Sequence, residues 1–193
     1  MTLKYNAPTV LTFTFISTGI LVLSQVLWQP DTPTLTETWF LVPGSGQFSP
    51  REINHWVGIV THVLGHGDWE HLVTNLAYIL LIGPMLEESY GSDRLLFMII
   101  LTSVFTGIIN IFFFHTGLLG ASGVVFMMIL LASFTNFSKG EIPLTFIMIL
   151  LLYLGREIYN SFSENNISQF AHIVGGLFGS IFGFSGFFAR RKT

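Results

Sequence analysis

Two side chains that could act together in acyl transfer stand in an otherwise apolar sequence. Ser122 lies in the segment G-A-S-G at 120–123, directly before a long apolar run, and His172 lies in a later apolar run. A serine hydroxyl becomes a nucleophile when a base takes its proton, and histidine most often supplies that base. No aspartate is placed to orient the histidine. We therefore expect a catalytic dyad, with Ser122 as the nucleophile and His172 as the general base.

A second pair of polar residues, His71 and Asn75, could stabilise the negative charge that develops in acyl transfer. They are four positions apart, so they share one face of a helix. The tetrahedral intermediate carries an oxyanion that needs fixed donors, and losing one donor typically costs about 100- to 1000-fold in rate. We expect the oxyanion donors to be His71, Asn75 and the backbone N–H of Ser122.

Each of these groups also has an ordinary explanation. A serine at the start of a helix often caps that helix. Ser, Asn and His side chains in membrane helices commonly hydrogen-bond to neighbouring helices. The four groups fall on three apolar runs at similar depth, which favours a shared site, while the capping alternative for Ser122 stays open.

The composition predicts that lipid is the solvent of this chain. Of its 193 residues, 51% are hydrophobic and 10% are charged, and the mean hydropathy is +0.65. An average soluble domain has roughly 25% charged residues. The net charge of −3 argues against a nucleic-acid partner, and the absence of cysteine excludes disulfides and thiol chemistry.

Six apolar runs approach the roughly 20 residues that a helix needs to cross a bilayer. The sequence predicts an all-α membrane protein, a single domain over 1–193, with transmembrane helices at about 8–28, 69–87, 93–114, 122–137, 142–160 and 168–187. If the spans alternate, most Lys and Arg residues fall on one side, which places both termini in the cytoplasm. The short core suggests a bacterial inner membrane.

The segment between the first two runs is predicted to be a large outer loop that is partly embedded in the membrane. It has about 40 residues, far more than an ordinary helix connection. All four tryptophans lie in it or at its borders, and tryptophan favours the membrane–water boundary. Ser49 and Pro50 predict the start of a helix that runs to about Leu64.

The run that begins at Ser122 is short. About 16 residues give roughly 24 Å, less than the ~30 Å hydrocarbon core. The preceding segment 115–121 must therefore dip into the membrane, which puts Ser122 roughly 6 Å below the outer boundary. Non-helical backbone at that depth is tolerated only inside protein or beside water. Gly117, Gly120 and Gly123 suit such a loop.

A stripe of small residues accompanies His172. His172, Gly176, Gly179 and Gly183 recur at steps of four, three and four, so they share one helical face. Small residues at such spacing let two membrane helices approach closely. We therefore expect His172 to face a partner helix.

These motifs resemble those of the rhomboid family of intramembrane serine proteases, and within it the bacterial GlpG type. The matching residues are G-A-S-G at 120–123, Ala171-His172 followed by Gly175 and Gly179, His71-x-x-x-Asn75, and the preceding His62 and His66. The resemblance implies the six-span fold, the nucleophile Ser122, the base His172 and the oxyanion donors His71 and Asn75. It also implies cleavage of single-span membrane proteins in or near their transmembrane segment, in the lipid bilayer. We expect no metal or other cofactor.

The resemblance implies structural roles for further residues. Glu87 matches a glutamate of a structural network at the cytoplasmic end of the second span, and Gly179 matches a glycine in close helix contact. Phe126 stands where a tyrosine packs on the base. The remaining positions with implied packing roles are Gly120, Gly123 and Gly175.

Three other classes of function stay open. A non-catalytic protein could bind membrane helices without cutting them. A metal-dependent membrane protein could use His62, His66 and His71, although the H-E-x-x-H motif is absent. A small transporter would suit six spans but lacks a visible inverted repeat. The roles of His62, His66 and His115 stay open too.

Overall fold

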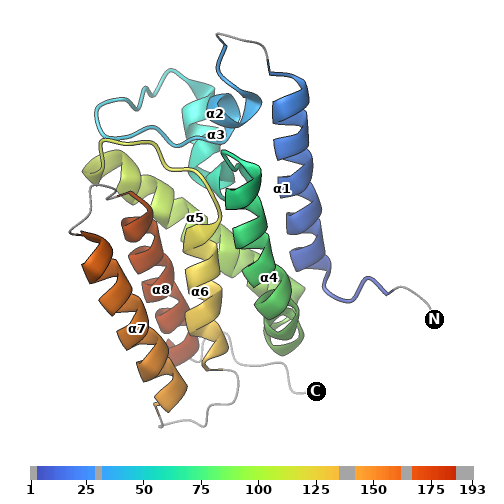
Figure 1. Cartoon of the computed structure of the whole chain (residues 1–193), viewed down its shortest axis with the longest axis vertical. Helices are drawn as coiled ribbons and strands as arrows, with labels where there is room; N and C mark the ends of the chain where they lie inside the picture. The colour runs from blue at the N-terminus through green and yellow to red at the C-terminus, as the bar shows by residue number, and fades with distance from the viewer. Residues whose placement is uncertain (1–3, 29–31, 135–141, 162–166, 186–193) are drawn as a thin grey trace.

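The chain folds into a bundle of helices that run between two ends of the molecule, and a loop with short helices covers one end (Figure 1). The computed structural model describes residues 4–28, 32–134, 142–161 and 167–185. Its helices are α1 (Pro8–Val26), α2 (Leu35–Trp39), α3 (Ile53–Thr61), the 3-10 turn η1 (His62–Leu64), α4 (Trp69–Tyr90), α5 (Ser92–Phe113), α6 (Ser122–Ala132), α7 (Leu144–Ser161) and α8 (Ile167–Ser185). In these ranges the only β pairing is an isolated bridge between Val42 and Leu118. The all-α prediction is therefore confirmed.

Each of the six predicted spans coincides with one helix: α1, α4, α5, α6, α7 and α8. Among the described residues, two of these helices are long and apolar enough to cross a membrane by length and composition, namely α1 and α5. The helices at Ser122–Ala132 and Phe170–Ser185 are apolar but shorter. The number of spans stays a prediction. The expected extensions to 137 and 187 lie outside the described residues.

The loop between α1 and α4 contains more helix than predicted. Thr34 begins α2 through a capping box, in which its side chain accepts from the Glu37 N–H and the Glu37 carboxylate accepts from the Thr34 N–H. The predicted helix start at Ser49 and Pro50 is wrong, because Glu52 precedes the first helical residue of α3. The segment 49–52 instead forms a turn, closed by a 3.1 Å bond from the Glu52 N–H to the Ser49 carbonyl.

Glu87 joins the end of α4 to the start of α1. The residue before α1, Ala7, has no side chain that can cap the helix. The buried Glu87 carboxylate supplies the missing acceptors, at 2.8 Å from the Thr9 nitrogen and 3.0 Å from the Val10 nitrogen. These N–H groups belong to the first turn, which has no partners within the helix. Glu87 therefore ties the last turns of α4 to the first turn of α1.

The substitution Glu87→Ala is expected to lower the free energy of unfolding by about 1–3 kcal/mol, because it leaves two N–H groups of α1 without acceptors. Unfolding in detergent, followed by circular dichroism, measures the change. Glu70→Ala is the matched control, since this exposed glutamate lies in the first turn of the same helix. A loss no larger than that of the control would contradict the capping role.

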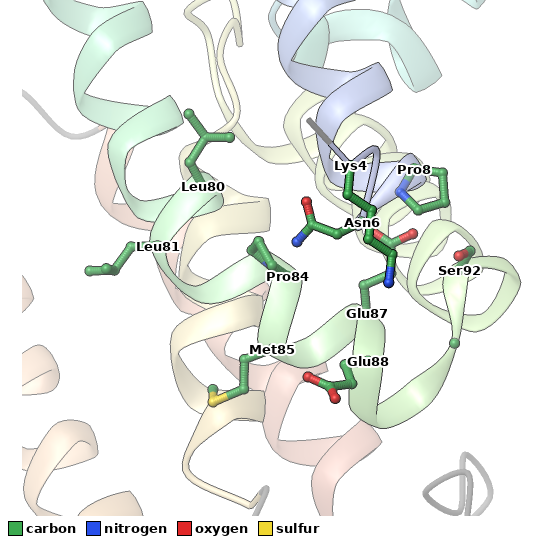
Figure 2. Close-up of a pocket in the computed structure, with 11 residues that line it drawn as sticks. Lys4, Asn6, Pro8, Leu80, Leu81, Pro84, Met85, Glu87, Glu88 and Ser92 are labelled. Carbon is green, nitrogen blue, oxygen red and sulfur yellow. The ribbon is translucent and has the colours of Figure 1, made fainter. Parts of the chain in front are cut away.

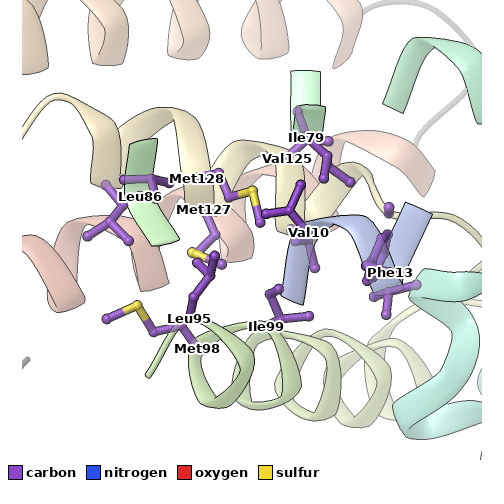
Figure 3. Close-up of a cluster of buried hydrophobic side chains, with 14 of the residues drawn as sticks. Val10, Phe13, Ile79, Leu86, Leu95, Met98, Ile99, Val125, Met127 and Met128 are labelled. Atoms are coloured by element: carbon purple, nitrogen blue, oxygen red, sulfur yellow. The ribbon is translucent and has the colours of Figure 1, made fainter. Parts of the chain in front are cut away.

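The buried core lies where α1, α4, α5 and α6 meet. Figure 3 shows part of it, with Val10 and Phe13 from α1, Ile79 from α4, Ile99 from α5 and Met127 from α6. Except for Phe13 at 7%, each of these side chains is at most 4% exposed. This cluster fixes the relative positions of α4 and α6, the helices that carry His71 and Ser122.

Candidate active site

Ser122 is the first residue of α6 and is half-buried. The N-cap position belongs to Ala121, so Ser122 does not cap the helix from that position. In the described part of the chain its hydroxyl makes no hydrogen bond. Catalytic hydrogen bonds in substrate-free enzymes are often long and tighten only in the complex. The capping alternative therefore loses its support, and the hydroxyl is free for other chemistry.

The loop before Ser122 is held from three sides. Leu118 exchanges two backbone hydrogen bonds with Val42 of the outer loop, at 3.0 and 2.9 Å. The Gly120 N–H donates to the His62 carbonyl at 3.0 Å, and the Asn110 side chain donates to the Thr116 carbonyl at 3.1 Å. The outer loop, η1 and α5 thus fix the non-helical backbone that leads to the serine.

His71 lies against this loop at Gly120. Gly120 has a φ of +112°, which favours glycine, and a Cβ there would lie 2.5 Å from both Cε1 and Nε2 of the His71 ring. The ring is therefore close to the backbone two residues before Ser122. Asn75 is buried one turn further along α4, and its amide donates to the His71 carbonyl at 3.0 Å. Of the two predicted side-chain donors, the structure brings the His71 ring next to the serine loop.

The packing of α8 against α6 places His172 near the start of α6. A Cβ at Gly123 would lie 3.1 Å from the Ala171 carbonyl oxygen. Gly123, which directly follows Ser122, is therefore in close contact with Ala171, which directly precedes His172. The Phe126 and His172 rings have their centroids 4.2 Å apart, with their planes at 41°. Phe126 therefore packs against the ring of His172, which we expect to be the base.

The small-residue face of α8 meets α6 at Gly179, which lies in the predicted row, and also at Gly175 beside that row. A Cβ at Gly175 would collide with the Gly123 carbonyl, and one at Gly179 would collide with the Met127 carbonyl. The close contact with α6 therefore includes Ala171, Gly175 and Gly179, and His172 directly follows the first of these residues.

His62 is an unpredicted anchor of the site. It is 1% exposed, and its Nδ1 lies 3.2 Å from the carbonyl oxygens of Gly58 and Ile59. A carbonyl only accepts, so Nδ1 carries the proton, and Nε2 lies 3.2 Å from the Thr106 hydroxyl oxygen. Burial lowers the pKa of His62 to about 4, which keeps this neutral tautomer at physiological pH. These contacts hold His62 in place, and its own backbone carbonyl accepts the hydrogen bond from the Gly120 N–H.

The signal for this anchor is present in the sequence of α5. Thr102, Thr106 and Asn110 recur at steps of four, and each is at most 1% exposed. Such a polar row in an apolar helix marks a face that packs against polar neighbours.

His66 is fully buried beside His71. Their ring centroids are 4.9 Å apart in an edge-to-face arrangement. Burial, with a smaller contribution from nearby His71, lowers the pKa of His66 to about 4. His66 therefore stays neutral and packs against the ring of His71.

The free energy of unfolding is expected to fall as the pH is lowered from about 6.5 to about 4. In this window the unfolded chain protonates His62 and His66, whose ordinary pKa is about 6.5, while the folded chain keeps them neutral. The stabilisation is fully present above pH ~6.5, and each histidine contributes at most about 3 kcal/mol of the change. Thermal unfolding in detergent between these pH values measures it. The pH dependence should be shallower in His66→Gln, and an unaltered slope would argue against a neutral buried His66.

His115 is exposed on the loop, and its carbonyl accepts from the Gln47 side chain at 3.2 Å. Within the described ranges, no group of three or more His, Cys, Asp or Glu side chains is placed to hold a metal ion.

Comparison with known proteins agrees with this arrangement. The Rhomboid domain family model matches residues 53–188, which include all four expected site residues. Rhomboid protease GlpG of Haemophilus influenzae is 27% identical over 128 residues, which cover 65% of this chain and 67% of that protein. The chloroplast Rhomboid-like protein 11 of Arabidopsis thaliana is 24% identical over 142 residues, with 65% of this chain and 51% of that protein covered. Since the family model matches more than half of the chain, this protein belongs to the membrane-embedded rhomboid family.

Proposed function

We propose that this protein is an intramembrane serine endopeptidase that cleaves single-span membrane proteins in or near their transmembrane segment. The observation that carries the proposal is the contact between the start of α6 and α8, where Gly123 meets Ala171 next to Ser122 and His172. A relative named as a protease supports the same activity. The proposed site lies in a bacterial inner membrane, with both termini on the cytoplasmic side.

In the proposed reaction, His172 takes the proton of Ser122 while the hydroxyl oxygen attacks the scissile carbonyl. His172 then gives this proton to the leaving amine, and water hydrolyses the acyl-enzyme in the reverse sequence of proton transfers. The His71 ring, one N–H of the Asn75 amide and the Ser122 N–H stabilise the oxyanion. Phe126 holds the imidazole against α6 during both steps.

Substrate selection follows from the geometry of a membrane helix. Peptide bonds within a helix are engaged in internal hydrogen bonds, so the substrate has to unwind before the serine attacks. Helices with Gly or Pro near the outer face unwind at lower cost. A recessed serine also leaves room only for a small residue before the scissile bond.

Stiffening the outer part of a substrate helix is expected to slow cleavage. Each Gly→Leu change in the substrate raises the cost of unwinding by about 1 kcal/mol, so two changes slow the reaction roughly 10- to 30-fold. Initial rates in detergent measure this effect. The control substrate has the same changes in the opposite half of its helix. Equal rates for all substrates would refute unwinding as the filter.

A serine-reactive fluorophosphonate tests the proposal directly. The Ser122 oxygen displaces fluoride from phosphorus, and mass spectrometry should find the adduct on Ser122 of the intact protein but not in His172→Ala. Cleavage of a single-span substrate should stop after labelling and persist with a chelator. Failure both to label and to cleave would favour a non-catalytic helix-binding protein, and loss of cleavage with the chelator would favour a metal enzyme.

A further inference from the structure

A cavity of about 650 Å³ lies at the end of the bundle opposite Ser122. It opens between the segment before α1 and the last turns of α4, with Lys4 and Asn6 on one wall and Met85 and Glu88 on the other (Figure 2). Ser122 starts α6 at the far end, so this cavity is separate from the candidate active site.

One wall of the cavity changes from apolar to charged along α4. Leu81, Met85 and Glu88 follow at steps of four and three, which places them on one helical face. Leu81 is 77% exposed and Met85 is 44% exposed, although both are apolar. In a membrane-embedded protein such a face suits a molecule with an apolar chain and a polar end, with the polar end toward Glu88.

The cavity has two charged groups of opposite sign, Lys4 and Glu88, that can bind a ligand. In the part of the chain that the structure describes, Lys4 and Glu88 are exposed, and neither has a hydrogen bond or an ion pair. Glu87, the other carboxylate of the cavity, already accepts from Thr9 and Val10 of α1. Glu88 is therefore the carboxylate that a bound cation can reach, and Lys4 is the cation that a bound anion can reach.

We propose that this cavity binds a phospholipid whose headgroup carries both a phosphate and a primary ammonium group, as phosphatidylethanolamine does. The ammonium group donates to the Glu88 carboxylate, and Lys4 donates to the phosphate. The acyl chains lie along Leu81 and Met85. An anionic headgroup without an ammonium group would leave Glu88 unpaired beside a negative charge, and a quaternary ammonium has no N–H to donate. The site thereby distinguishes these three lipid classes.

Lipid titration of the full chain in a neutral detergent, followed by native mass spectrometry, tests the proposal. The probes are phosphatidylethanolamine, phosphatidylcholine and phosphatidylglycerol with identical acyl chains. We expect phosphatidylethanolamine to bind about tenfold more tightly than the other two. Glu88→Gln should abolish this preference, while Lys4→Gln should weaken binding of all three lipids because each carries the phosphate.

Glu70→Gln is the matched control, because it makes the same change at an exposed position at the other end of α4 and should keep the preference. Equal affinity of the intact protein for the three lipids would overturn the proposal, as would an equal effect of Glu88→Gln and Glu70→Gln. Competition by free phosphoethanolamine at the concentration of the lipid would overturn the lipid as the ligand.

Discussion

Replacement of Ser122 by alanine is expected to lower the rate of peptide cleavage by about 10⁴- to 10⁶-fold, the range seen when an activated nucleophile is removed. The side chain is small, half-buried and without a hydrogen bond in the described chain, so the fold should tolerate its loss. A fluorogenic single-span substrate in detergent measures kcat, and thermal unfolding verifies that the variant is folded.

Ser180→Ala is the control for this variant. Ser180 also lies in an apolar helix, but its hydroxyl donates to the Gly176 carbonyl of its own helix at 2.8 Å. Its loss should change kcat less than about threefold, since it stands apart from the serine loop. Because residues of one catalytic unit are not additive, Ser122→Ala combined with His172→Ala should be no slower than Ser122→Ala alone. Substantial cleavage by Ser122→Ala would refute the nucleophile.

Gly175→Ala is expected to lower the free energy of unfolding by about 3 kcal/mol and to reduce cleavage at least tenfold. The added methyl group would occupy the position of the Gly123 carbonyl, so α6 and α8 have to move apart. Overpacking of this kind typically costs about 1–3 kcal/mol, and the cost is high here because the obstacle is backbone and not a flexible side chain. The same movement separates the segments that carry Ser122 and His172. Unfolding in detergent and the cleavage assay measure the two effects.

Gly19→Ala in α1 provides the comparison. A Cβ at Gly19 would have no neighbour within 4 Å, so the exchange should be neutral or stabilise the helix by up to about 1 kcal/mol. If Gly175→Ala proved as stable and as active as Gly19→Ala, close packing of α6 on α8 would not be what assembles the site.

The apolar helices were predictable because hydrophobicity over a long run leaves few alternatives. The starts of α4 and α6 agree with the prediction, and that of α5 agrees to within one residue. The short α2 was not predicted, although Thr34 and Glu37 have the spacing of a capping box. The start of α3 was misplaced because Pro50 serves equally well in a turn and in a first helical turn.

The candidate site was predictable as far as it depends on residue type and on spacing within one helix. Ser122, His71 and His172 were proposed in this way. How closely their segments approach one another was not predictable, because it depends on how α6 packs against α4 and α8. The hydrogen bond from the Gly120 N–H to the His62 carbonyl also has no signal in the sequence, since it joins backbone atoms that only the folded chain brings together.

The position of Glu87 has a consequence for the order of assembly. The Glu87 carboxylate accepts from the N–H groups of Val10 and Thr9, which lie 77 and 78 residues earlier in the chain. During synthesis the beginning of α1 therefore lacks these acceptors until the whole of α4 has been made and has docked beside it. The start of α1 and the end of α4 should therefore become stable together. In a truncated nascent chain that ends before Glu87, the first turn of α1 should be less stable than in the full chain.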